Sequence, residues 1–282
     1  MNILTFRADL HTHTTYSDGA STPKELLDLA KIKQLSAVGI TDHDSVNGID
    51  EAIHYGKKIG IEIIPGVEIS TDVEETEVHI LGYFIDHKDK ELNKVLKFFR
   101  DERLERGKRI IKKLNNIGLE ITLNDVLEFS ESAPICRPHI AKAMLKKGHV
   151  KNFIQAFQKY IGDGGPASER KIHVSAQSAL KIINDAGGLS FIAHPGKMKE
   201  SILQNLIHLG VDGIEAVHPS HKKYQQKFYK GIVNQYCLLE SGGSDFHGGM
   251  RSDETNLGKY YVSASVLDGI KKSLRTKKSN SI

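Results

Sequence analysis

Residues 8–22 read ADLHTHTTYSDGAST, a short apolar run followed by two histidines that are one residue apart. Side chains alternate between the two faces of an extended chain, so His11 and His13 point to the same side. Asp18 follows in a Ser-Asp-Gly turn, which can fold its carboxylate back toward the imidazoles. The stretch therefore predicts a cluster of two imidazoles and a carboxylate at the end of a strand.

Short apolar runs elsewhere have the length of buried strands, and amphipathic segments lie between several of them. One segment begins with a capping box at Thr22 to Glu25, and another ends at Gly187, where glycine can close a helix. Alternating strands and helices favour a mainly parallel sheet, either closed or doubly wound, and 282 residues suit an α/β barrel. The predicted strands are 37–41, 62–68, 77–83, 189–193, 212–217 and 238–241.

The strand pattern stops between residues 88 and 171. Helical patterns replace it, and the glycine-rich segment 162–166 then predicts a loop that returns the chain to the α/β body. We therefore expect a barrel domain made of residues 1–87 and 172–282, interrupted by a helical insertion at 88–171. The predicted helices of the insertion are 89–116, 124–129, 138–147 and 152–160.

The composition is that of a globular protein, with 39% hydrophobic and 26% charged residues. No apolar run approaches the ~20 residues of a membrane-spanning helix, and the first residues lack the pattern of a signal peptide. Cys136 and Cys237 are far apart in the sequence and fit a reducing compartment. A net charge of +4 is too small for a dedicated nucleic-acid binder. We expect a cytoplasmic protein without a membrane anchor, and the sequence indicates no protein partner.

Potential metal ligands recur where the predicted strands end. In an α/β barrel, the carboxyl ends of the strands form the face on which active sites are built. Burying so many polar groups at one end of a sheet is costly unless a cation is their common partner. Nitrogen and oxygen ligands without cysteine suit Zn²⁺, Mn²⁺ or Fe, and their number predicts two or three ions. The residues are His11, His13, Asp42, His43, Glu68, His79, His194, Asp245 and His247.

The ordered motifs resemble those of the PHP (polymerase and histidinol phosphatase) family of metal-dependent phosphoesterases. The resemblance runs from about residue 8 to residue 250 and implies a distorted (β/α)7 TIM-like barrel that holds up to three divalent ions. It is carried by LHTHTTYSDG, GITDHDS, PGVEIS, VHILGY, FIAHPG and GGSDFHG.

The resemblance also implies how the ligands are shared. Glu68 would bridge two ions, which a carboxylate with two oxygens can do and a single imidazole nitrogen cannot. Asp42, beside His43, would orient a ligand. The first ion would be held by His11, His13, Glu68 and Asp245, the second by Glu68, His79 and His194, and the third by Asp18, His43 and His247.

Clustered divalent ions lower the pKa of bound water and bind phosphate oxygens, so the predicted reaction is attack of a metal-activated hydroxide on phosphorus. Manganese is the favoured metal. The helical insertion and the segment RPHIA at 137–141 resemble the branch that acts on nucleotides. The expected substrate is a nucleoside 3′,5′-bisphosphate. A 5′-3′ exoribonuclease acting on short RNA, a histidinol-phosphate phosphatase and a non-catalytic metal-binding module are the alternatives.

Three residues are candidates for substrate binding. Arg137 can grip a second phosphate through its guanidinium fork, or it can form a surface salt bridge. His139 can add a further contact. His221, in the segment HPSHKK, can touch the scissile phosphate or the leaving group, or it can cap a helix.

The remaining basic and imidazole side chains carry no motif. The series Lys94, Lys97, Arg100, Arg103 and Arg106 spirals around a helix and alternates with acidic residues, so it predicts a solvated helix face rather than an RNA track. The other histidines are expected to be ordinary residues: His54, His87, His149, His173, His208 and His218.

Overall fold

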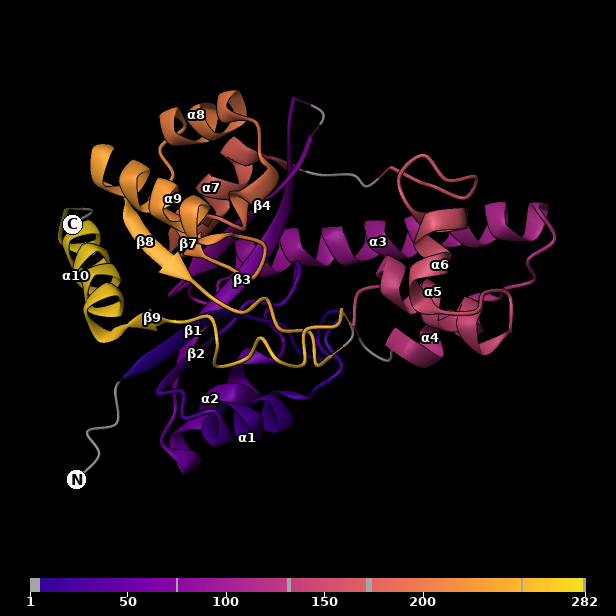
Figure 1. The fold of residues 1–282 in the computed structure, drawn as a ribbon, viewed down its shortest axis with the longest axis horizontal. Helices are drawn as coiled ribbons and strands as arrows, with labels where there is room; N and C mark the ends of the chain where they lie inside the picture. Colours follow the sequence, from indigo (N-terminus) through magenta and orange to yellow (C-terminus); the bar gives the residue numbers. More distant parts are fainter. Residues whose placement is uncertain (1–5, 75, 131–132, 171–173, 250, 281–282) are drawn as a thin grey trace.

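The computed structural model describes residues 6–74, 76–130, 133–170, 174–249 and 251–280. Eight strands form a nearly closed, barrel-like sheet with helices around it (Figure 1), in the order β8-β7-β6-β4-β3-β2-β1-β9, and β5 pairs with β3. The expected α/β barrel class is confirmed. The strands are β1 (Arg7–Thr12), β2 (Ala37–Ile40), β3 (Glu62–Val73), β4 (Thr76–Tyr83), β5 (Val174–Ser175), β6 (Leu189–Ile192), β7 (Gly213–Val217), β8 (Leu239–Gly242) and β9 (Val262–Ser263).

The sheet is less parallel than the sequence predicts. Strands β1, β2 and β3 are parallel to one another, as are β6, β7 and β8, but β4 runs antiparallel to both β3 and β6. A β-hairpin in which Val73 pairs with Thr76 causes this reversal, and it places His79 opposite Ser70. The hairpin therefore brings an imidazole of β4 close to the carboxylate that β3 carries two residues earlier, at Glu68.

The segment that follows β8 closes the barrel against β1. The amide of Asp245 donates to the carbonyl oxygen of His11 over 2.9 Å, and Thr12 forms a bridge with Phe246. Along β1, Leu10 faces an apolar cluster shared with β3, β4 and β6, whereas His11 faces the other way. The side chains of residues 8–13 thus alternate between the two faces of the strand as expected, and the face opposite the apolar cluster carries the imidazoles.

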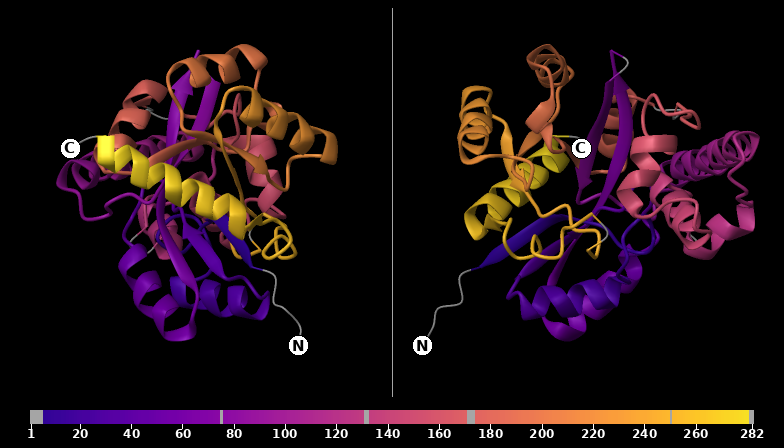
Figure 2. Two further views of the ribbon diagram at one scale, coloured as in Figure 1. Left: turned by 90° about the vertical axis from the view of Figure 1, so that its left-hand side faces the viewer. Right: turned by 45° about the vertical axis from the view of Figure 1, so that its right-hand side comes forward.

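Helices surround the sheet in the views of Figure 2. The capping box at Thr22 is present, since the Thr22 side chain accepts from the amide of Glu25 and the Glu25 carboxylate accepts from the amide of Thr22. Apolar faces of these helices pack on the strands to form the main core. The helices are α1 (Pro23–Ile32), α2 (Ile49–Ile59), α7 (Ala176–Asp185), α8 (Glu200–His208), α9 (Lys223–Gln235) and α10 (Ala264–Asn280), with a short 3₁₀ turn η2 (Pro195–Lys197).

A helical segment projects from one side of the barrel (Figure 1). Its long helix packs on the main core through Leu96 and Phe99, while its second half joins a separate apolar cluster that includes Ile110 and Met144. The separate apolar cluster of the helical segment is consistent with the predicted helical insertion. The predicted bounds of this insertion, residues 88 and 171, stay a prediction. The segment contains α3 (Lys90–Asn116), α4 (Leu123–Ser130), α5 (Arg137–Lys146), α6 (Phe153–Ala156) and the π-helix η1 (Phe157–Ile161).

The basic series on α3 is only partly a solvated face. Lys94 and Lys97 are exposed and pair with neighbouring acids, but Arg103 and Arg106 are only 6% and 7% exposed. The guanidinium of Arg103 is bound to Asp44, in the loop after β2. The expectation is therefore wrong for these two arginines, because contacts distant in sequence cover them.

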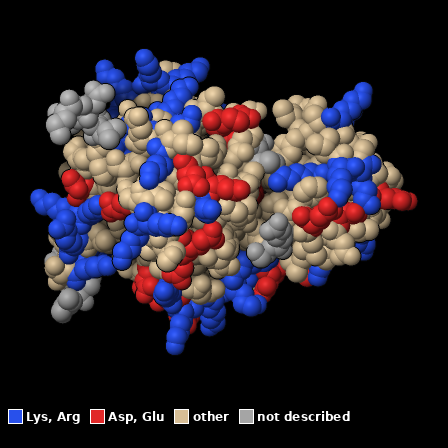
Figure 3. All heavy atoms as spheres, turned by 90° about the horizontal axis from the view of Figure 1, so that it is seen from below, with Lys and Arg blue, Asp and Glu red and all other residues tan. Residues whose placement is uncertain are grey.

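The surface charge and the helices give no indication of a nucleic-acid track or of a membrane span in the described part of the chain. Figure 3 shows acidic side chains interspersed among basic ones on the face seen from below. Among the helices in the described part of the chain, none is both long enough and apolar enough to cross a bilayer.

Candidate metal centre

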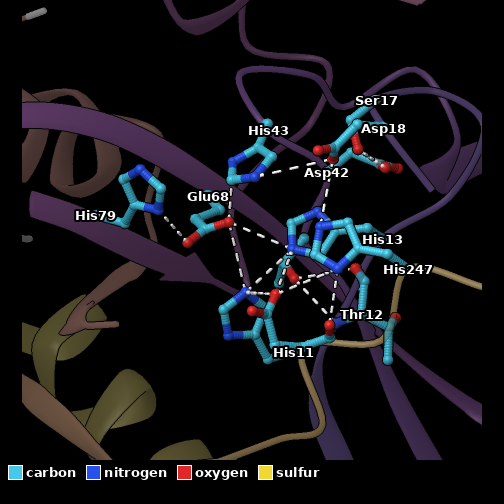
Figure 4. Close-up of polar contacts among 12 residues, drawn as sticks. His11, Thr12, His13, Ser17, Asp18, Asp42, His43, Glu68, His79 and His247 are labelled. Carbon is cyan, nitrogen blue, oxygen red and sulfur yellow. Dashed lines mark hydrogen bonds and ion pairs between the residues drawn. The ribbon is translucent and has the colours of Figure 1, made fainter. Parts of the chain in front are cut away.

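The nine residues that the motifs single out lie together at one end of the barrel. His11 lies in β1, Glu68 in β3 and His79 in β4, and the others lie on the loops that leave β1, β2, β6 and β8. Figure 4 shows the rings of His11, His43 and His79 directed at the carboxylate of Glu68. The remaining members of the cluster are His13, Asp18, His194, Asp245 and His247.

One group of ligand atoms lies between β1 and the loop after β8. The Nε2 atoms of His11 and His13 are 3.1 Å apart. Each lies close to Oδ1 of Asp245, at 3.3 and 3.1 Å, and to Oε2 of Glu68, at 3.4 and 3.3 Å. These two nitrogens and two oxygens surround one point, as the ligands of a single ion do.

Glu68 faces two groups at once. Its Oε2 lies toward His11 and His13, whereas its Oε1 is 2.8 Å from Nδ1 of His79 and 3.0 Å from Nε2 of His194. The carboxylate is buried, with a side chain that is 1% exposed. Its two oxygens can therefore serve two ions.

A third group surrounds Asp18. Nε2 of His247 lies 3.3 Å and Nε2 of His43 lies 3.8 Å from Oδ1 of Asp18, and His13 is close enough to contribute a ligand atom to the same group. The other oxygen of Asp18, Oδ2, accepts from the Arg251 guanidinium over 2.6 Å. The two oxygens of Asp18 thus face different partners.

Unpaired buried atoms test whether this cluster suits metal ions. Among the described residues, several ring nitrogens and carboxylate oxygens of the cluster are buried without a hydrogen-bond partner. Leaving such atoms unpaired is costly, and imidazole nitrogen with carboxylate oxygen is a donor set that divalent transition metals accept. The residues fit divalent metal binding. The unpaired atoms are His13 Nδ1, Asp18 Oδ1, His43 Nδ1, Glu68 Oε2 and His247 Nε2.

The carboxylates of the cluster are held in their charged form. Burial opposes ionisation of Glu68, but the neighbouring imidazoles, His43 first, hold the pKa of its carboxyl well below the usual range. Burial likewise opposes ionisation of Asp18, but Arg251, His247 and His43 together outweigh it and hold the pKa of that carboxyl well below the usual range.

The imidazoles of the cluster differ in their pKa. Burial lowers the pKa of His43 to about 3, which keeps its imidazole neutral. Burial also favours the neutral form of His13 and His79, but the neighbouring carboxylates raise the pKa of both rings to about 9. A cation, which binds ionised carboxylates and neutral imidazoles, therefore has to displace the protons of these two rings.

Glu215 is a buried acidic residue beside the cluster that no sequence motif indicates. It is fully buried in β7, where Oε1 lies 3.0 Å from Nδ1 of His11 and Oε2 accepts from the backbone amide of His194 over 2.7 Å. His194 itself has a positive φ of 29°, a backbone conformation that non-glycine residues rarely adopt. The only signal in the sequence is one acidic residue inside the apolar run GIEAV.

His218 is also part of the cluster, although no motif covers it. Its ring is buried, and Nε2 lies 3.5 Å from Oδ2 of Asp245. With His11 and Glu215 it forms a further group with the spacing of metal ligands. Among the other histidines expected to be ordinary, His173 lies outside the described residues, and His54, His87, His149 and His208 belong to none of the candidate metal groups among those described.

Asp42 acts on the loop and not on its neighbour. Its carboxylate accepts from the amide and hydroxyl of Thr14, over 2.7 and 2.6 Å, and from the Ser17 hydroxyl over 2.5 Å. No hydrogen bond joins it to His43 in the described part of the chain. Asp42 therefore fixes the loop between His13 and Asp18, so the ligands that it would orient are those on this loop and not His43.

The three candidate substrate residues have different surroundings. Arg137 lines a 330 Å³ cavity beside the cluster and also pairs with the exposed Asp163 over 2.6 Å. His139 lines a separate 230 Å³ cavity, and its Nδ1 accepts from the amide of Cys136, which caps α5. His221 donates from Nδ1 to the Ala216 carbonyl oxygen over 3.0 Å, and its Nε2 is buried without a partner among the described residues.

A second cavity opens directly on the cluster. Its volume is 490 Å³, and its wall includes His79, His194, His218 and Asp245. Arg251 borders both this cavity and the 330 Å³ cavity. A ligand can therefore lie on the cluster and extend toward the helical segment.

Known proteins resemble this chain in both sequence and fold. The sequence model of the PHP domain matches residues 9–187. A solved structure from Bifidobacterium adolescentis, assigned as a metal-dependent phosphoesterase, superposes with a TM-score of 0.86 at 30% identity and covers 93% of this chain and 94% of its own.

Two curated relatives align over most of their length. The 5′-3′ exoribonuclease of Haemophilus influenzae is 32% identical over 86% of this chain and 91% of its own. The 3′,5′-nucleoside bisphosphate phosphatase of Chromobacterium violaceum is 33% identical over 85% of this chain and 86% of its own. The two relatives thus differ in the reaction for which they are named.

Proposed function

The chain belongs to the PHP domain family and is a metal-dependent phosphoesterase, and from this premise we propose that it removes phosphate from nucleoside 3′,5′-bisphosphates. The observation that carries the proposal is the arginine-lined 330 Å³ cavity beside the ligand cluster. A substrate with two phosphates needs one site for the scissile group and another, basic site for the group that stays. The name of the Chromobacterium violaceum relative supports the same substrate class.

The nine clustered residues are proposed to hold two or three divalent ions, with manganese favoured. Glu68 is the proposed bridging ligand, which its two divergent oxygens support. Such ions supply water of lowered pKa and neutralise charge on the phosphate oxygens. His43 also lies 2.9 Å from Oε2 of Glu68, so it borders two of the proposed sets, and His13 lies close to the third set as well as in the first. The proposed sets are His11, His13, Glu68 and Asp245; Glu68, His79 and His194; and Asp18, His43 and His247.

The chain's own side chains orient the substrate. Arg137 is the proposed ligand of the second phosphate, because its partner Asp163 is 93% exposed and a pair of this kind is weak enough to exchange for a phosphate. His221 is proposed to contact the scissile phosphate or the leaving group through Nε2. His139 is proposed to act through the helix cap that positions Arg137, the first residue of α5.

Trimming of short RNA from its 5′ end is the second candidate, and the Haemophilus influenzae relative favours it. Both reactions place one phosphate on the cluster, but RNA needs room for a chain that continues beyond the first nucleotide. On the face in Figure 3, acidic residues interrupt the basic ones, so that face offers no continuous track for a strand.

A phosphate-release screen tests the proposal. The chelator-treated protein is supplied with Mn²⁺ and assayed on nucleoside 3′,5′-bisphosphates, mononucleotides, histidinol phosphate and short RNAs. The expected result is preferential release of inorganic phosphate from the bisphosphates. A ladder of mononucleotides from RNA in the absence of bisphosphate turnover would establish the second candidate instead. Metal-loaded, folded protein that turns over none of these esters would indicate a binding module.

A further inference from the structure

The 330 Å³ cavity lies where the helical segment meets the ligand face of the barrel. Its barrel side carries Asp18, His43 and His79, which belong to the cluster. Four arginines from separate places in the sequence also line it, together with two phenylalanines and the acidic Glu77. The arginines are Arg103, Arg106, Arg137 and Arg251, and the aromatic residues are Phe153 and Phe157.

Arg106 differs from the other three arginines of this cavity. Arg103 is paired with Asp44, Arg137 with Asp163 and Arg251 with Asp18. The Nε of Arg106 donates to the backbone oxygen of Glu169 over 2.9 Å, but no described acidic side chain lies within ion-pair distance of its guanidinium. The residue is only 7% exposed. The charge of Glu77, on the wall of the same cavity, acts on Arg106 only from beyond ion-pair distance. Buried arginines are almost always paired, so this position suits a bound anion.

The charge of Arg106 is costly as it stands. Burial, followed by the positive charges of Arg137 and Arg103, lowers its pKa to about 10. The guanidinium is therefore still protonated near neutral pH. A phosphate group would relieve this repulsion and accept hydrogen bonds from the free side of the guanidinium fork.

An aromatic wall stands next to these guanidiniums. The rings of Phe153 and Phe157 have centroids 5.2 Å apart and border the same cavity. Phe157 is the first residue of the π-helix η1, a rare conformation that recurs at functional sites. Aromatic faces beside basic side chains are the combination that binds nucleotides by stacking the base and pairing the phosphate.

We propose that Arg106 binds the phosphate of the substrate that is not hydrolysed, while Phe153 and Phe157 contact its base. Together with Arg137, Arg106 then makes the enzyme prefer a bisphosphate to a monophosphate. This inference rests on the proposed function, because it assigns the second phosphate of that substrate. It adds to the role of Arg137, which approaches the same cavity from α5.

The test compares Arg106→Met with wild type on adenosine 3′,5′-bisphosphate, on the two adenosine monophosphates and on p-nitrophenyl phosphate. We expect kcat/KM for the bisphosphate to fall about 10- to 100-fold, mainly through KM, because one charge-assisted contact is lost. The rates of the variant on p-nitrophenyl phosphate, and on the adenosine monophosphate that carries only the hydrolysed phosphate, should stay within about twofold of the wild-type rates. Arg106→Lys, which keeps the charge, should recover part of the loss.

Arg109→Met is the matched control. Arg109 lies on the same helix, is 44% exposed in its side chain and contacts the Glu169 carboxylate over 3.2 Å, but it does not line the cavity. Its kinetics should equal those of wild type. Equal losses on every substrate in Arg106→Met and Arg106→Lys, or no loss on the bisphosphate, would overturn the inference.

Binding of adenosine 3′,5′-bisphosphate, measured by calorimetry on metal-loaded protein, separates this inference from the proposed function. Turnover of the bisphosphate with affinity independent of Arg106 defeats only the inference. Binding that depends on Arg106 without hydrolysis defeats only the proposed function. A wild-type protein that neither binds nor hydrolyses the compound defeats both.

The contact of Phe153 and Phe157 with the base is tested by a separate binding measurement. Phe157→Leu should weaken binding of adenosine 3′,5′-bisphosphate about tenfold, because a leucine side chain cannot stack on a base as an aromatic ring does. It should leave binding of a ribose bisphosphate without a base unchanged. Phe228→Leu is the control, since Phe228 is 50% exposed on α9 and lies outside the cavity. Equal weakening of both ligands would remove the aromatic part of the proposal.

Discussion

Glu215 fixes the orientation of His11. The 3.0 Å contact from its Oε1 to Nδ1 of His11 places the ring proton on Nδ1, which leaves the lone pair of Nε2 facing the cluster. The second oxygen of the same carboxylate holds the backbone of His194. One buried carboxylate in β7 thus positions residues from two of the proposed ligand groups.

Glu215→Gln should weaken metal binding without unfolding the protein. The amide keeps the shape of the side chain, but its NH₂ group must face either Nδ1–H of His11 or the amide of His194, and both are donors. Metal affinity should fall about 10- to 100-fold, and added metal should restore part of the activity. Competition with a chelator measures the affinity. Glu240→Gln on the adjacent β8 is the control, and an unchanged affinity in Glu215→Gln would contradict the role assigned to Glu215.

The fold was predictable from the sequence to the extent that local patterns determine it. The apolar runs predict most strands to within a residue or two, because short buried strands have a composition of their own. The direction of β4 was not predictable in this way. The polar residues Ser70 to Asp72 look like the end of a strand, but pairing with β4 extends β3 as far as Val73.

The site divides in a similar way. Its candidate ligands follow strand ends and carry motifs, so their positions were predictable, and their role as ligands stays a proposal. Glu215 and His218 were missed because a single acidic residue in a strand, or a single histidine after one, has no local signature. The burial of Arg106 was not predictable because its partner, the backbone oxygen of Glu169, is distant in sequence.

Removal of divalent ions should abolish hydrolysis and lower stability together. The unpaired nitrogens and oxygens of the cluster lose their common partner, so for each occupied site the free energy of unfolding should fall by about 2.7 kcal/mol relative to protein with metal at a hundred times its dissociation constant. Thermal unfolding and phosphate release, measured before and after dialysis against a chelator, give the two readouts. Activity that survives complete removal of metal would contradict metal dependence.

His194→Ala and Asp245→Ala should abolish turnover while leaving the fold largely intact. Each side chain lies at the cluster and is partly exposed to the 490 Å³ cavity, so its loss removes a proposed ligand and little of the apolar core. Turnover, metal content and circular dichroism check the result. His54→Ala, an exposed histidine on α2, should behave like wild type. A near-normal rate in either cluster variant would refute the role of that residue.

Arg103→Met should destabilise the junction between the helical segment and the barrel. The substitution breaks the buried ion pair between Arg103 and Asp44, and removing one member of a buried pair typically costs about 3–5 kcal/mol. Urea denaturation measures the loss. Lys97→Met, which breaks an exposed pair with Asp101, should change stability by less than about 1 kcal/mol. If the free energy of unfolding of the double variant Arg103→Met, Asp44→Asn falls by the sum of the two single losses, the two side chains do not stabilise each other and the prediction is wrong.

Gly243→Ala should disturb both stability and the ligand cluster, because no space exists for a side chain at this position. A Cβ atom there would lie 2.4 Å from the backbone nitrogen of His11 and 2.9 Å from Oδ1 of Asp9. The strand end of β1 and the segment that leads to Asp245 must then separate. Overpacking of this kind costs about 1–3 kcal/mol.

The same displacement would move Asp245 away from His11, so metal affinity should fall along with the free energy of unfolding. Denaturation and chelator competition measure these two quantities. Gly231→Ala is the matched control, because nothing lies within 4 Å of its added Cβ on α9 and alanine favours a helix over glycine by about 1 kcal/mol. That variant should be as stable as wild type or more so. If Gly243→Ala matched it in stability and in metal affinity, the close approach of the two segments would not be what holds Asp245 against His11.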